Sequence, residues 1–401
     1  MKERFDLLIA GGGVVGLTAA ALLARSDQAH RLAIRVVEAG QRPRFSIDDD
    51  VGLRVSALSA GSAEVLARAG AWPRIEAERT CPFREMRVWD ASGSARGPDA
   101  LHFDAAEFAV PSLGHIVENA LVQDALLASL EKSGVQVDFG RPLADCRSQG
   151  GRPTVVFGDG DAVSAELVIG ADGADSPLRR LTRIPVTSWR YPQSAFVTHL
   201  APEVSHAHCA WQRFLPDGPL ALLPLADGRV SVVWSTLPAN AEGAMAASDA
   251  ALGERLTEAS DRVLGRLTVA ASRASFRLKA QYAAHYVRPG LALIGDAAHS
   301  IHPLAGQGAN LGIADAAILA RAVTDAVAAG EYPGDWPVLR RYERARKGAN
   351  QTMLYFVDGL NRLFSSASPA LTTLRSAGIR LFNHSGPVRR RAVAVALGVS
   401  R

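Results

Sequence analysis

The first forty residues alternate between apolar runs and glycines in a pattern that predicts a strand, a turn and a helix. FDLLIA, residues 5–10, is apolar on both faces, as expected of a buried parallel strand. Four glycines follow between residues 11 and 16, and VGLTAAALLAR, residues 15–25, has the small and apolar residues of a buried helix. LAIRVVE, residues 32–38, predicts the next strand.

The same segment is long enough to be a signal peptide or a membrane span, because no charged residue occurs from Leu7 to Ala24. A spanning helix has to be continuous, and glycines at its centre would weaken it. We therefore expect the strand, turn and helix rather than a targeting segment.

Later apolar runs predict two further kinds of strand. LVIG, residues 167–170, runs into an Asp-Gly turn, and LALIG, residues 291–295, runs into a glycine-rich loop and a helix. Residues 187–278 are richer in strands, with GPLALLPL (218–225) and RVSVVWS (229–235) on either side of an Asp227-Gly228 hairpin signal. In residues 220–225 both alternating faces are apolar, so one face is expected to pack on helices. The other face could cover an apolar site, but an ordinary sheet buried on both faces fits the pattern equally well.

Composition and charge exclude several classes of protein. With 401 residues, 48% of them hydrophobic and 21% charged, the chain can bury a large core in two to three domain-sized units, which excludes a disordered or fibrous protein. Its 44 basic and 40 acidic residues leave a net charge of only +4, too weak to predict a nucleic-acid partner. Three cysteines without a CxxC spacing argue against a disulfide scaffold and for a reducing compartment.

Two histidine pairs are spaced like metal ligands, His299 with His302 and His206 with His208. No acidic or cysteine ligand accompanies them at a recognised spacing, so we expect no metal site. His299 is expected instead to support the loop that holds Asp296. The chain also has no GxSxG or HExxH motif, which leaves hydrolase chemistry without an identifiable nucleophile.

The glycines of the first turn form a GxGxxG motif, Gly11, Gly13 and Gly16, between the predicted strand and helix. The first glycine permits the turn, the second lets the backbone approach a pyrophosphate, and the third allows close packing of helix on strand. Glu38, at the end of the next strand, can accept hydrogen bonds from ribose hydroxyls and would repel a 2′-phosphate. This turn is therefore expected to hold FAD or NAD rather than NADP.

The other two turns suit the same kind of ligand. Taken alone, Asp172-Gly173 is as consistent with an ordinary turn as with a binding site. The later loop is more specific, because Asp296 at a strand end can bind a sugar-like hydroxyl. Gly306, Gly308 and the backbone near Ala309 and Asn310 can direct N–H groups, at a helix N-terminus, toward an electron-poor ring.

These three motifs, GxGxxG at the start, GADGADS at 170–176 and GDAAHSIHPLAGQGAN at 295–310, together resemble those of the class A flavoprotein monooxygenases, the group of para-hydroxybenzoate hydroxylase. Other segments are similar to the ubiquinone-biosynthesis hydroxylases, which act on polyprenylated phenols. These segments are 54–72, 114–126, 191–200, 213–225 and 339–353. The resemblance covers nearly the whole chain.

The resemblance implies that FAD is the cofactor. The implied cofactor-binding residues are Gly11, Gly13, Gly16, Glu38, Arg54, Gln123, Asp172, Gly173, Asp296, Gly306, Gly308, Ala309 and Asn310. The glycine turn and Glu38 would hold the adenosine half, Arg54 and Gln123 would lie beside the pyrophosphate and ribityl chain, and Asp172 and Gly173 near the pyrophosphate. Asp296 would bind the ribityl chain, and Ala309 and Asn310 would lie under the flavin ring.

On the substrate side, the resemblance places Pro303 at the border of the substrate, and we assign Leu220 and Leu222 to the apolar cover of the site. A sheet closing over the flavin would exclude water, which protects a flavin hydroperoxide. No catalytic side chain can be named, since the cofactor carries the chemistry. One departure from the family motif is Asp175, where a neutral or basic residue is usual.

The expected fold class is α/β. A three-layer Rossmann-like FAD-binding domain is expected over residues 1–78, 105–186 and 279–335, with an inserted mixed β-sheet substrate domain over 79–104 and 187–278 and a C-terminal helical region over 336–401.

The expected activity is hydroxylation of the aromatic ring of a polyprenylphenol in ubiquinone biosynthesis, with O₂ as co-substrate and NAD(P)H or an electron-transfer partner as reductant. The alternatives are a hydroxylase of another hydrophobic phenol, a flavin oxidoreductase that does not activate oxygen, and a non-catalytic flavin-binding member of a biosynthetic complex.

The C-terminal tail carries arginines but no acidic residue after Asp358. The simple reading is that its helices pack on the FAD domain. The sharper hypothesis is that the tail docks on an anionic membrane surface or on accessory proteins of ubiquinone biosynthesis, which predicts a cytoplasmic protein peripheral to the inner membrane. The tail arginines are Arg362, Arg375, Arg380, Arg389, Arg390, Arg391 and Arg401.

Overall fold

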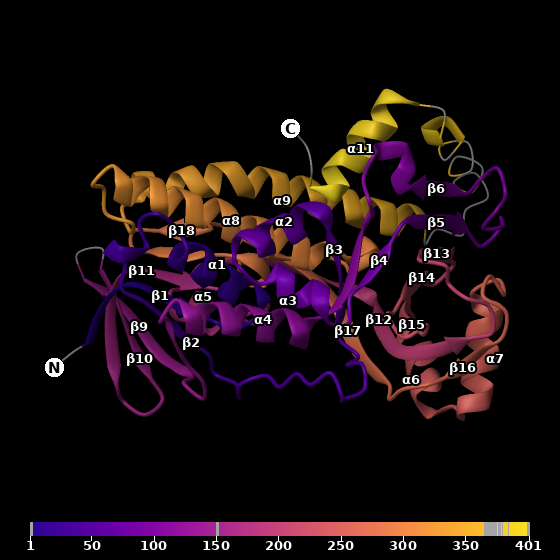
Figure 1. Cartoon of the computed structure of the whole chain (residues 1–401), viewed down its shortest axis with the longest axis horizontal. Helices are drawn as coiled ribbons and strands as arrows, with labels where there is room; N and C mark the ends of the chain where they lie inside the picture. The colour runs from indigo at the N-terminus through magenta and orange to yellow at the C-terminus, as the bar shows by residue number, and fades with distance from the viewer. Residues whose placement is uncertain are drawn as a thin grey trace.

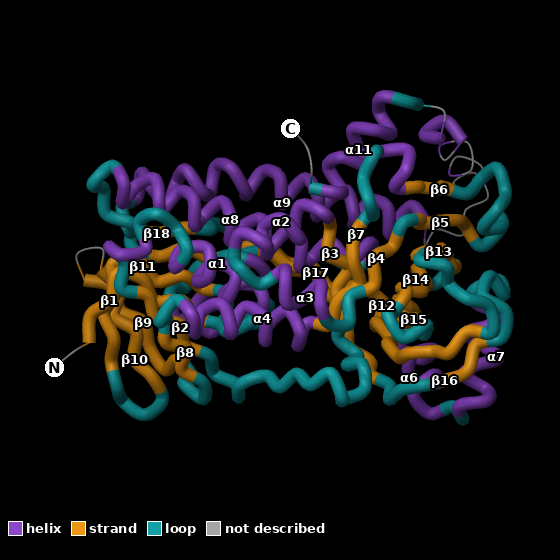
Figure 2. Tube along the Cα trace, in the orientation of Figure 1, coloured by secondary structure: helices purple, strands orange, loops and turns teal. Residues whose placement is uncertain are grey.

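The structure is a computed structural model that describes residues 3–149, 152–364, 375, 378, 380–383 and 385–398. Two large sheets lie side by side along the long axis, with helices over both (Figures 1 and 2). The segment read as strand, turn and helix is confirmed, because β1 covers Glu3–Ala10 and α1 covers Val14–Ala24.

The first large sheet has a parallel centre whose strands are buried on both faces. β1 lies in its middle, and Leu7, Leu8 and Ile9 are completely buried there, which explains why the run is apolar at every position. The parallel strands, in order across the sheet, are β19 (Leu291–Leu293), β11 (Ala162–Gly170), β1, β2 (Ile34–Val37) and β8 (Gln136–Asp138). The antiparallel additions are β18 (Val287–Arg288) on β19, and β10 (Arg152–Phe157) with β9 (Leu143–Gln149) on β11.

Helices pack on this sheet and form the outer layers of the domain. α1 packs on α4 and α8, and the long α9 packs on α8. The bounds are α4 (Asn119–Lys132), α8 (Gln307–Ala328) and α9 (Trp336–Phe364), with the shorter α2 (Ala60–Arg68), α3 (Trp72–Ala77) and α5 (Pro177–Leu181). A small antiparallel sheet bridges to the other half of the molecule and consists of β3 (Val55–Ser59), β7 (Gly114–Glu118) and β4 (Cys81–Phe83).

The second large sheet is built mainly from the segment that was expected to be rich in strands. In order it contains β20 (His299–Ser300), β17 (Ala274–Ala283), β12 (Val186–Pro202), β15 (Val230–Thr236), β14 (Gly218–Pro224), β13 (Cys209–Leu215), β5 (Glu85–Asp90) and β6 (Leu101–Asp104), with β16 (Leu267–Val269) beside β12. The predicted hairpin joins β14 to β15, and Gly228 in its turn has φ +87°.

One face of this sheet is sealed by α6 (Pro238–Ala246) and α7 (Asp249–Ala259). Trp89, Trp211 and Trp234 fill the core on that face. The opposite face turns toward the first sheet and the functional site. The predicted combination of a Rossmann-like domain with a second mixed sheet is thus confirmed, while the residue boundaries drawn between the domains remain a proposal, since β17 crosses one of them.

The C-terminal segment packs on the second half of the molecule. Arg375 lies 3.5 Å from Asp90, the guanidinium of Arg380 contacts Asp99, and Arg389 lies 2.9 Å from Glu107. These acids belong to β5, the loop that follows it and the segment after β6, and α11 (Pro387–Leu397) lies near β6 (Figure 1). Arg375 and Arg380 thus pair with acids of the segment expected to be the substrate domain, which corrects the expectation for these two, whereas Glu107, the partner of Arg389, lies in the segment expected to be the FAD domain. Arg401 lies outside the described residues.

Candidate functional site

A cavity of about 550 Å³ lies between the two large sheets. Gly13, Gly173 and Asp296 line it just beyond the carboxyl ends of β1, β11 and β19. The N-terminus of α8 and strand β3 form its sides, and β13, β14 and β15 cover it. Open parallel sheets bind ligands at this edge, because loops and helix N-termini meet there.

The glycine turn combines two tight contacts with one open position. A methyl group on Gly11, where φ is +118°, would lie 2.2 Å from the Ala171 carbonyl oxygen, and one on Gly16 would lie 2.0 Å from the Gly11 carbonyl oxygen. A methyl group on Gly13 would have no atom within 4 Å. The first and last glycines therefore hold strand and helix together, and Gly13 leaves space for a ligand against the backbone.

Glu38 and Gln123 hold this turn in place through hydrogen bonds from outside the cavity. The Glu38 carboxylate accepts hydrogen bonds from the backbone N–H groups of Gly12 at 2.6 Å and Gly40 at 2.7 Å. The amide of Gln123 donates to the Gly12 carbonyl oxygen at 3.0 Å. The structure places Glu38 and Gln123 beside the glycine turn but not among the residues that line the cavity.

The middle motif forms a tight turn around the Asp172 carboxylate. This carboxylate accepts hydrogen bonds from the Ser176 hydroxyl at 2.5 Å and from the Leu178 backbone N–H at 2.8 Å. Burial raises the pKa of Asp172, and these hydrogen bonds offset part of that rise. Gly173, at φ +82°, follows and faces the cavity with no atom within 4 Å of an added methyl group.

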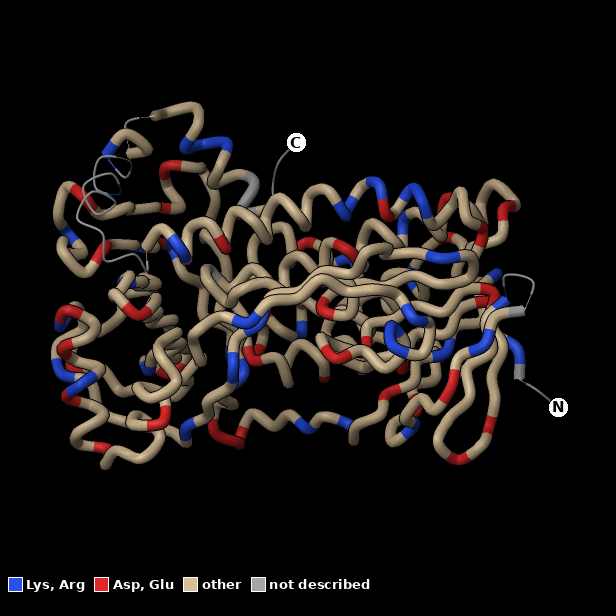
Figure 3. The backbone as a smooth tube through the Cα atoms, turned by 180° about the vertical axis from the view of Figure 1, so that it is seen from behind, with Lys and Arg blue, Asp and Glu red and all other residues tan. Residues whose placement is uncertain are grey.

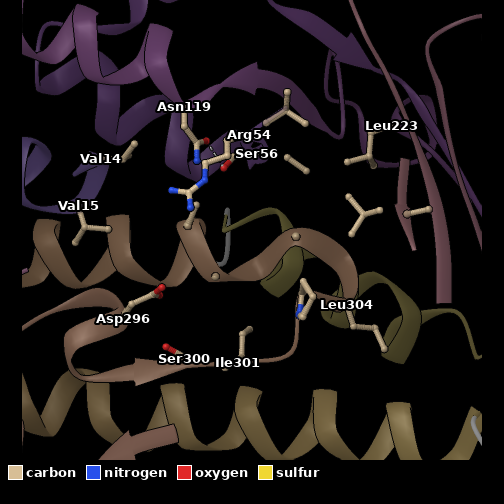
Figure 4. A pocket seen from close by; sticks show the side chains of 18 of the residues that line it. Val14, Val15, Arg54, Ser56, Asn119, Leu223, Asp296, Ser300, Ile301 and Leu304 are labelled. Atoms are coloured by element: carbon tan, nitrogen blue, oxygen red, sulfur yellow. Dashed lines mark hydrogen bonds between the residues drawn. The ribbon is translucent and has the colours of Figure 1, made fainter. Parts of the chain in front are cut away.

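Two charged side chains, Arg54 and Asp296, are found among the described residues that line the cavity. In Figure 4 they lie toward the end marked by Val14 and Val15, while Leu223 and Leu304 lie toward the other end. The Asp296 carboxylate opens into the cavity and accepts no hydrogen bond from any described residue. The surrounding protein raises its pKa by desolvation, so a hydroxyl-bearing ligand would supply the hydrogen bonds that it lacks.

Behind Asp296, a buried ionic cluster holds the loop. His299 Nε2 lies 2.5 Å from Asp315 Oδ2, and Arg346 Nε lies 2.7 Å from Asp315 Oδ1. Burial alone would raise the pKa of Asp315, but the two partners lower it. His299 therefore supports the loop, as predicted, through α8 and α9.

The N-terminus of α8 is directed at the cavity. The helix begins at Gln307 after Gly306, which adopts a left-handed φ of +62°, and Gly306, Gly308 and Ala309 line the space. The amides of a first helical turn have no partner within the helix and favour negative charge.

The Asn310 side chain has a structural role beside the one expected of its backbone, which stays a prediction. Its side-chain oxygen accepts hydrogen bonds from the Ser59 backbone N–H at 2.9 Å and the Ser62 hydroxyl at 2.7 Å. Its amide donates to the Ala57 carbonyl oxygen at 2.9 Å. The side chain therefore fixes α8 to β3 and α2, and it does not line the cavity.

The assignment of Leu220 and Leu222 to the cover of the site is corrected by the structure. Both point into the tryptophan core beneath α6 and α7, with 1% exposure each. Their neighbours in β14, Pro219, Ala221 and Leu223, face the cavity instead. Because both faces of this strand are apolar, the alternation of its side chains could not show which face meets the cavity. Pro303 does line the cavity, as expected.

Sequence reasoning missed several residues of the cavity. They are Ser56, Phe83, Met86, Asn119, Gln212, Ser235 and Ser300. Gln212 and Ser235 could have been predicted, because each directly follows a tryptophan in its strand and so points to the face opposite that large core residue. Phe83 and Met86 come from a distant segment and had none.

The histidines considered as metal ligands bind protein groups. His206 Nε2 lies 3.1 Å from the Leu225 carbonyl oxygen, His208 Nδ1 lies 2.9 Å from the Pro82 carbonyl oxygen, and His302 Nε2 lies 3.2 Å from Gln193 Oε1. No group of three or more His, Cys, Asp or Glu side chains suited to a metal is found in the described part of the chain.

The cavity fits FAD by the open space along its glycine turns and by its unmet polar groups. Gly13, Gly173 and Gly308 leave open space against the backbone. Asp296 can accept from hydroxyls, Arg54 can approach phosphates, and the α8 N-terminus can stabilise negative charge on a ring. The three turns predicted from the sequence thus converge on one cavity.

Comparisons with known proteins agree with this geometry. The family described as "FAD binding domain" matches residues 4–357. The chain is 37% identical over 399 residues to 3-demethoxyubiquinol 3-hydroxylase of Escherichia coli (strain K12), covering 99% of this chain and 100% of that protein. It is 35% identical to the mitochondrial ubiquinone biosynthesis monooxygenase COQ6 of Homo sapiens, covering 98% and 92% of the two chains.

Solved structures show the same fold. The p-nitrophenol 4-monooxygenase PnpA from Pseudomonas putida DLL-E4 has a TM-score of 0.79 at 20% identity over 100% of both chains. Klebsiella pneumoniae HpxO complexed with FAD and uric acid has a TM-score of 0.74 at 20% identity, covering 99% of this chain and 97% of that one. This chain belongs to the FAD-binding monooxygenase family, in the group that contains the ubiquinone-biosynthesis hydroxylases.

Proposed function

We propose that this FAD-dependent monooxygenase hydroxylates the aromatic ring of a polyprenylphenol intermediate of ubiquinone biosynthesis, with O₂ as co-substrate. The observation that carries the proposal is the lack of charge on the wall formed by the second sheet. Every described residue of β13, β14 and β15 that lines the cavity is uncharged. A substrate with a carboxylate would meet no cation on this wall, whereas a neutral phenol with an apolar tail meets a matching surface.

The roles of the chain follow from this arrangement. Bound FAD, once reduced, supplies the electrons with which one atom of O₂ is inserted into the ring and the other leaves as water. The glycine turns, Arg54 and Asp296 position the cofactor. Phe83, Met86 and Leu223 exclude water from the reacting ring, and Pro303 borders it.

The test compares phenols that differ in one group. We expect a prenylated phenol to be hydroxylated with a much higher kcat/KM than the same phenol without its prenyl group, and a carboxylated analogue to be a poor substrate. Equal kcat/KM with and without the prenyl group would favour the second candidate, a hydroxylase of another hydrophobic phenol, which the same uncharged wall also supports. Product formed under strict exclusion of O₂ would contradict monooxygenation.

For the reductant, we propose NAD(P)H or an electron-transfer partner. A second hollow of about 460 Å³ lies beside the middle motif and is lined by Arg180, Arg190 and Lys279, whose charges suit phosphate groups. Asp175, the unusual residue of that motif, lies 2.5 Å from Lys279 Nζ and compensates part of this charge. If NAD(P)H binds here, Arg190→Ala raises its KM while the rate with chemically reduced flavin stays unchanged. An unchanged KM would favour a protein donor.

We also propose a cytoplasmic enzyme attached peripherally to an anionic membrane, and the support for this comes from α9 more than from the tail. No described helix is both long and apolar enough to span a bilayer. α9 carries six basic residues and two acidic ones, and five of the basic residues lie between positions 340 and 347 (Figure 3). Several of them have acidic partners, as Arg341 has in Glu331 and Arg346 in Asp315. Tyr355 and Phe356 on this helix are 53% and 59% exposed. Aromatic side chains beside cations suit a lipid headgroup layer.

Liposome flotation with and without anionic lipid tests the attachment. Replacing Tyr355 and Phe356 by serine is expected to reduce binding to anionic liposomes. Arg389→Ala serves as the control, because Arg389 is already paired with Glu107. Binding that survives the removal of the aromatic pair but falls with Arg389→Ala would return the role to the tail. Binding that ignores the anionic lipid would exclude an electrostatic dock and leave the accessory proteins as the partner.

A further inference from the structure

Two polar side chains interrupt the otherwise apolar wall that faces the substrate end of the cavity. Gln212 on β13 is 5% exposed and Ser235 on β15 is 2% exposed. Neither side chain makes a hydrogen bond with any described residue, whereas Ser56 and Asn119, which also line the cavity, bond to each other at 2.7 Å.

The unmet groups open toward the cavity rather than being sealed in the core. The Ser300 hydroxyl, also at the cavity, is fully enclosed and has no partner, but the Gln212 amide and the Ser235 hydroxyl are not among the enclosed atoms. A ligand in the cavity that offers a donor or an acceptor to each of these groups can therefore bind both.

Strand register fixes where the two groups lie. Gln212 pairs with Ala221, which pairs with Val233. Pro219 and Ser235 lie two residues further along β14 and β15 and so share the same face. All five side chains line the cavity. Gln212 and Ser235 lie two strands apart across the sheet and two residues apart along it, which puts their backbones roughly 12 Å apart. A planar ring with oxygens on opposite sides can bridge that gap, because each hydrogen bond spans about 3 Å.

We propose that Gln212 and Ser235 form the subsite that binds the ring oxygens of a neutral phenol and so orient the ring in the cavity, with Gln212 as the residue that determines specificity. This inference rests on the function proposed above and names the polar contacts of that same site. An amide donates and accepts, so Gln212 can bind a phenol hydroxyl or a ring ether, and Ser235 can do the same as a smaller group. Ala221 between them leaves room for the ring.

The subsite also explains a discrimination that an apolar wall alone cannot give. A ring that lacks its oxygen would leave the Gln212 amide unpaired in the complex, and such a mismatch is rejected more strongly than a missing methylene group. Gln212 and Ser235 are positioning residues in this scheme, since neither transfers a proton nor forms a bond with the substrate.

The experiment measures binding before it measures turnover. The FAD-loaded protein is titrated with a prenylated phenol, and with the same molecule lacking the ring hydroxyl, while the flavin absorbance reports the dissociation constant. The variants are Gln212→Met, which keeps length and removes polarity, and Ser235→Ala. Leu222→Met is the matched control, because Leu222 lies on the same sheet but points away from the cavity into the tryptophan core. Flavin content per chain shows whether each variant is folded.

We expect the unaltered protein and Leu222→Met to prefer the phenol by tenfold or more. We expect Gln212→Met to lose that preference and Ser235→Ala to reduce it about threefold. In single turnovers with chemically reduced flavin, Gln212→Met should then release more hydrogen peroxide and less hydroxylated product. A Gln212→Met protein that keeps the full preference overturns the inference.

The outcomes separate this inference from the proposed function. If the unaltered protein prefers the phenol through Gln212 but hydroxylates neither compound, the proposed function fails and the subsite stands. If it hydroxylates the phenol and Gln212→Met does so with the same coupling and affinity, the subsite fails and the function stands. An unaltered protein that binds neither compound contradicts both.

Discussion

His302 should make the stability of this protein depend on pH in a way that one substitution can isolate. Its imidazole is 1% exposed, and burial lowers its pKa to about 4 from an ordinary value of 6.5. Its partners define the neutral tautomer. Nδ1 accepts a hydrogen bond from the Leu304 backbone N–H at 3.2 Å, so Nε2 carries the proton and donates to Gln193 Oε1 at 3.2 Å.

The sign and the size of the effect follow from this pair of pKa values. The unfolded chain takes up a proton first as the pH falls, so the contribution of His302 to stability is complete above pH 6.5 and is lost toward pH 4. A shift of 2.5 units corresponds to about 3 kcal/mol at the acid limit and to about 1.4 kcal/mol at pH 5.5. Protonation of His302 Nδ1 also places an N–H donor opposite the Leu304 N–H, and the repulsion between the two donors disturbs the loop that carries Pro303.

The assay compares urea unfolding of the unaltered protein and of His302→Gln at pH 7.5 and pH 5.5. We expect the variant to be less stable at pH 7.5 but to lose about 1.4 kcal/mol less on acidification, because the other histidines remain in both proteins. NMR titration of labelled histidine provides a direct reading, in which one resonance absent from the variant stays neutral down to pH 5. The same loss on acidification in both proteins would refute the reasoning.

Four further substitutions test the site. Gly13→Ala should leave the FAD-free protein as stable as before and weaken FAD binding at least tenfold, about 1.4 kcal/mol, whereas Gly16→Ala should lower the unfolding midpoint itself. Calorimetry measures the midpoint and flavin fluorescence measures FAD binding. Equal destabilisation by both substitutions would contradict the geometry. Asp296→Asn should stabilise the FAD-free protein at pH 7, since an acid with a raised pKa costs stability once the pH exceeds that pKa, and should weaken FAD binding; a lower thermal midpoint would argue against it. Leu222→Ala should cost about 2–5 kcal/mol in urea unfolding and leave phenol affinity unchanged; a change in affinity alone would place Leu222 at the cavity.

The convergence of the three turns could be predicted because each motif combines a local signal with a topological rule. A strand that ends in glycine or aspartate places those residues at the carboxyl edge of the parallel sheet, whichever other strands lie between. That reasoning located Gly13 and Asp296 without any knowledge of long-range contacts, whereas Gly173 was assigned through the family resemblance. The continuously apolar strands likewise indicated a sheet that is buried on both faces.

The rest of the site depended on information that is not local. Leu220 and Ala221 are both apolar, and only the choice of face on which helices pack decides which of them meets the cavity. The side chain of Asn310 binds partners some 250 positions earlier in the chain, a contact that its own surroundings do not encode. The ion pairs of the tail arginines could not be predicted, because their acidic partners, such as Asp99 and Glu107, lie in a distant segment.

The central claim is that this chain brings a neutral prenylated phenol, FAD and O₂ together and inserts one oxygen atom into the ring. The direct measurement reduces the FAD-loaded protein chemically without air, adds the phenol and ¹⁸O₂, and determines the product mass. We predict one ¹⁸O atom on the aromatic ring, with product in proportion to reduced flavin. An unlabelled hydroxylated ring, or reoxidation of the flavin that leaves every phenol unchanged, would contradict the account.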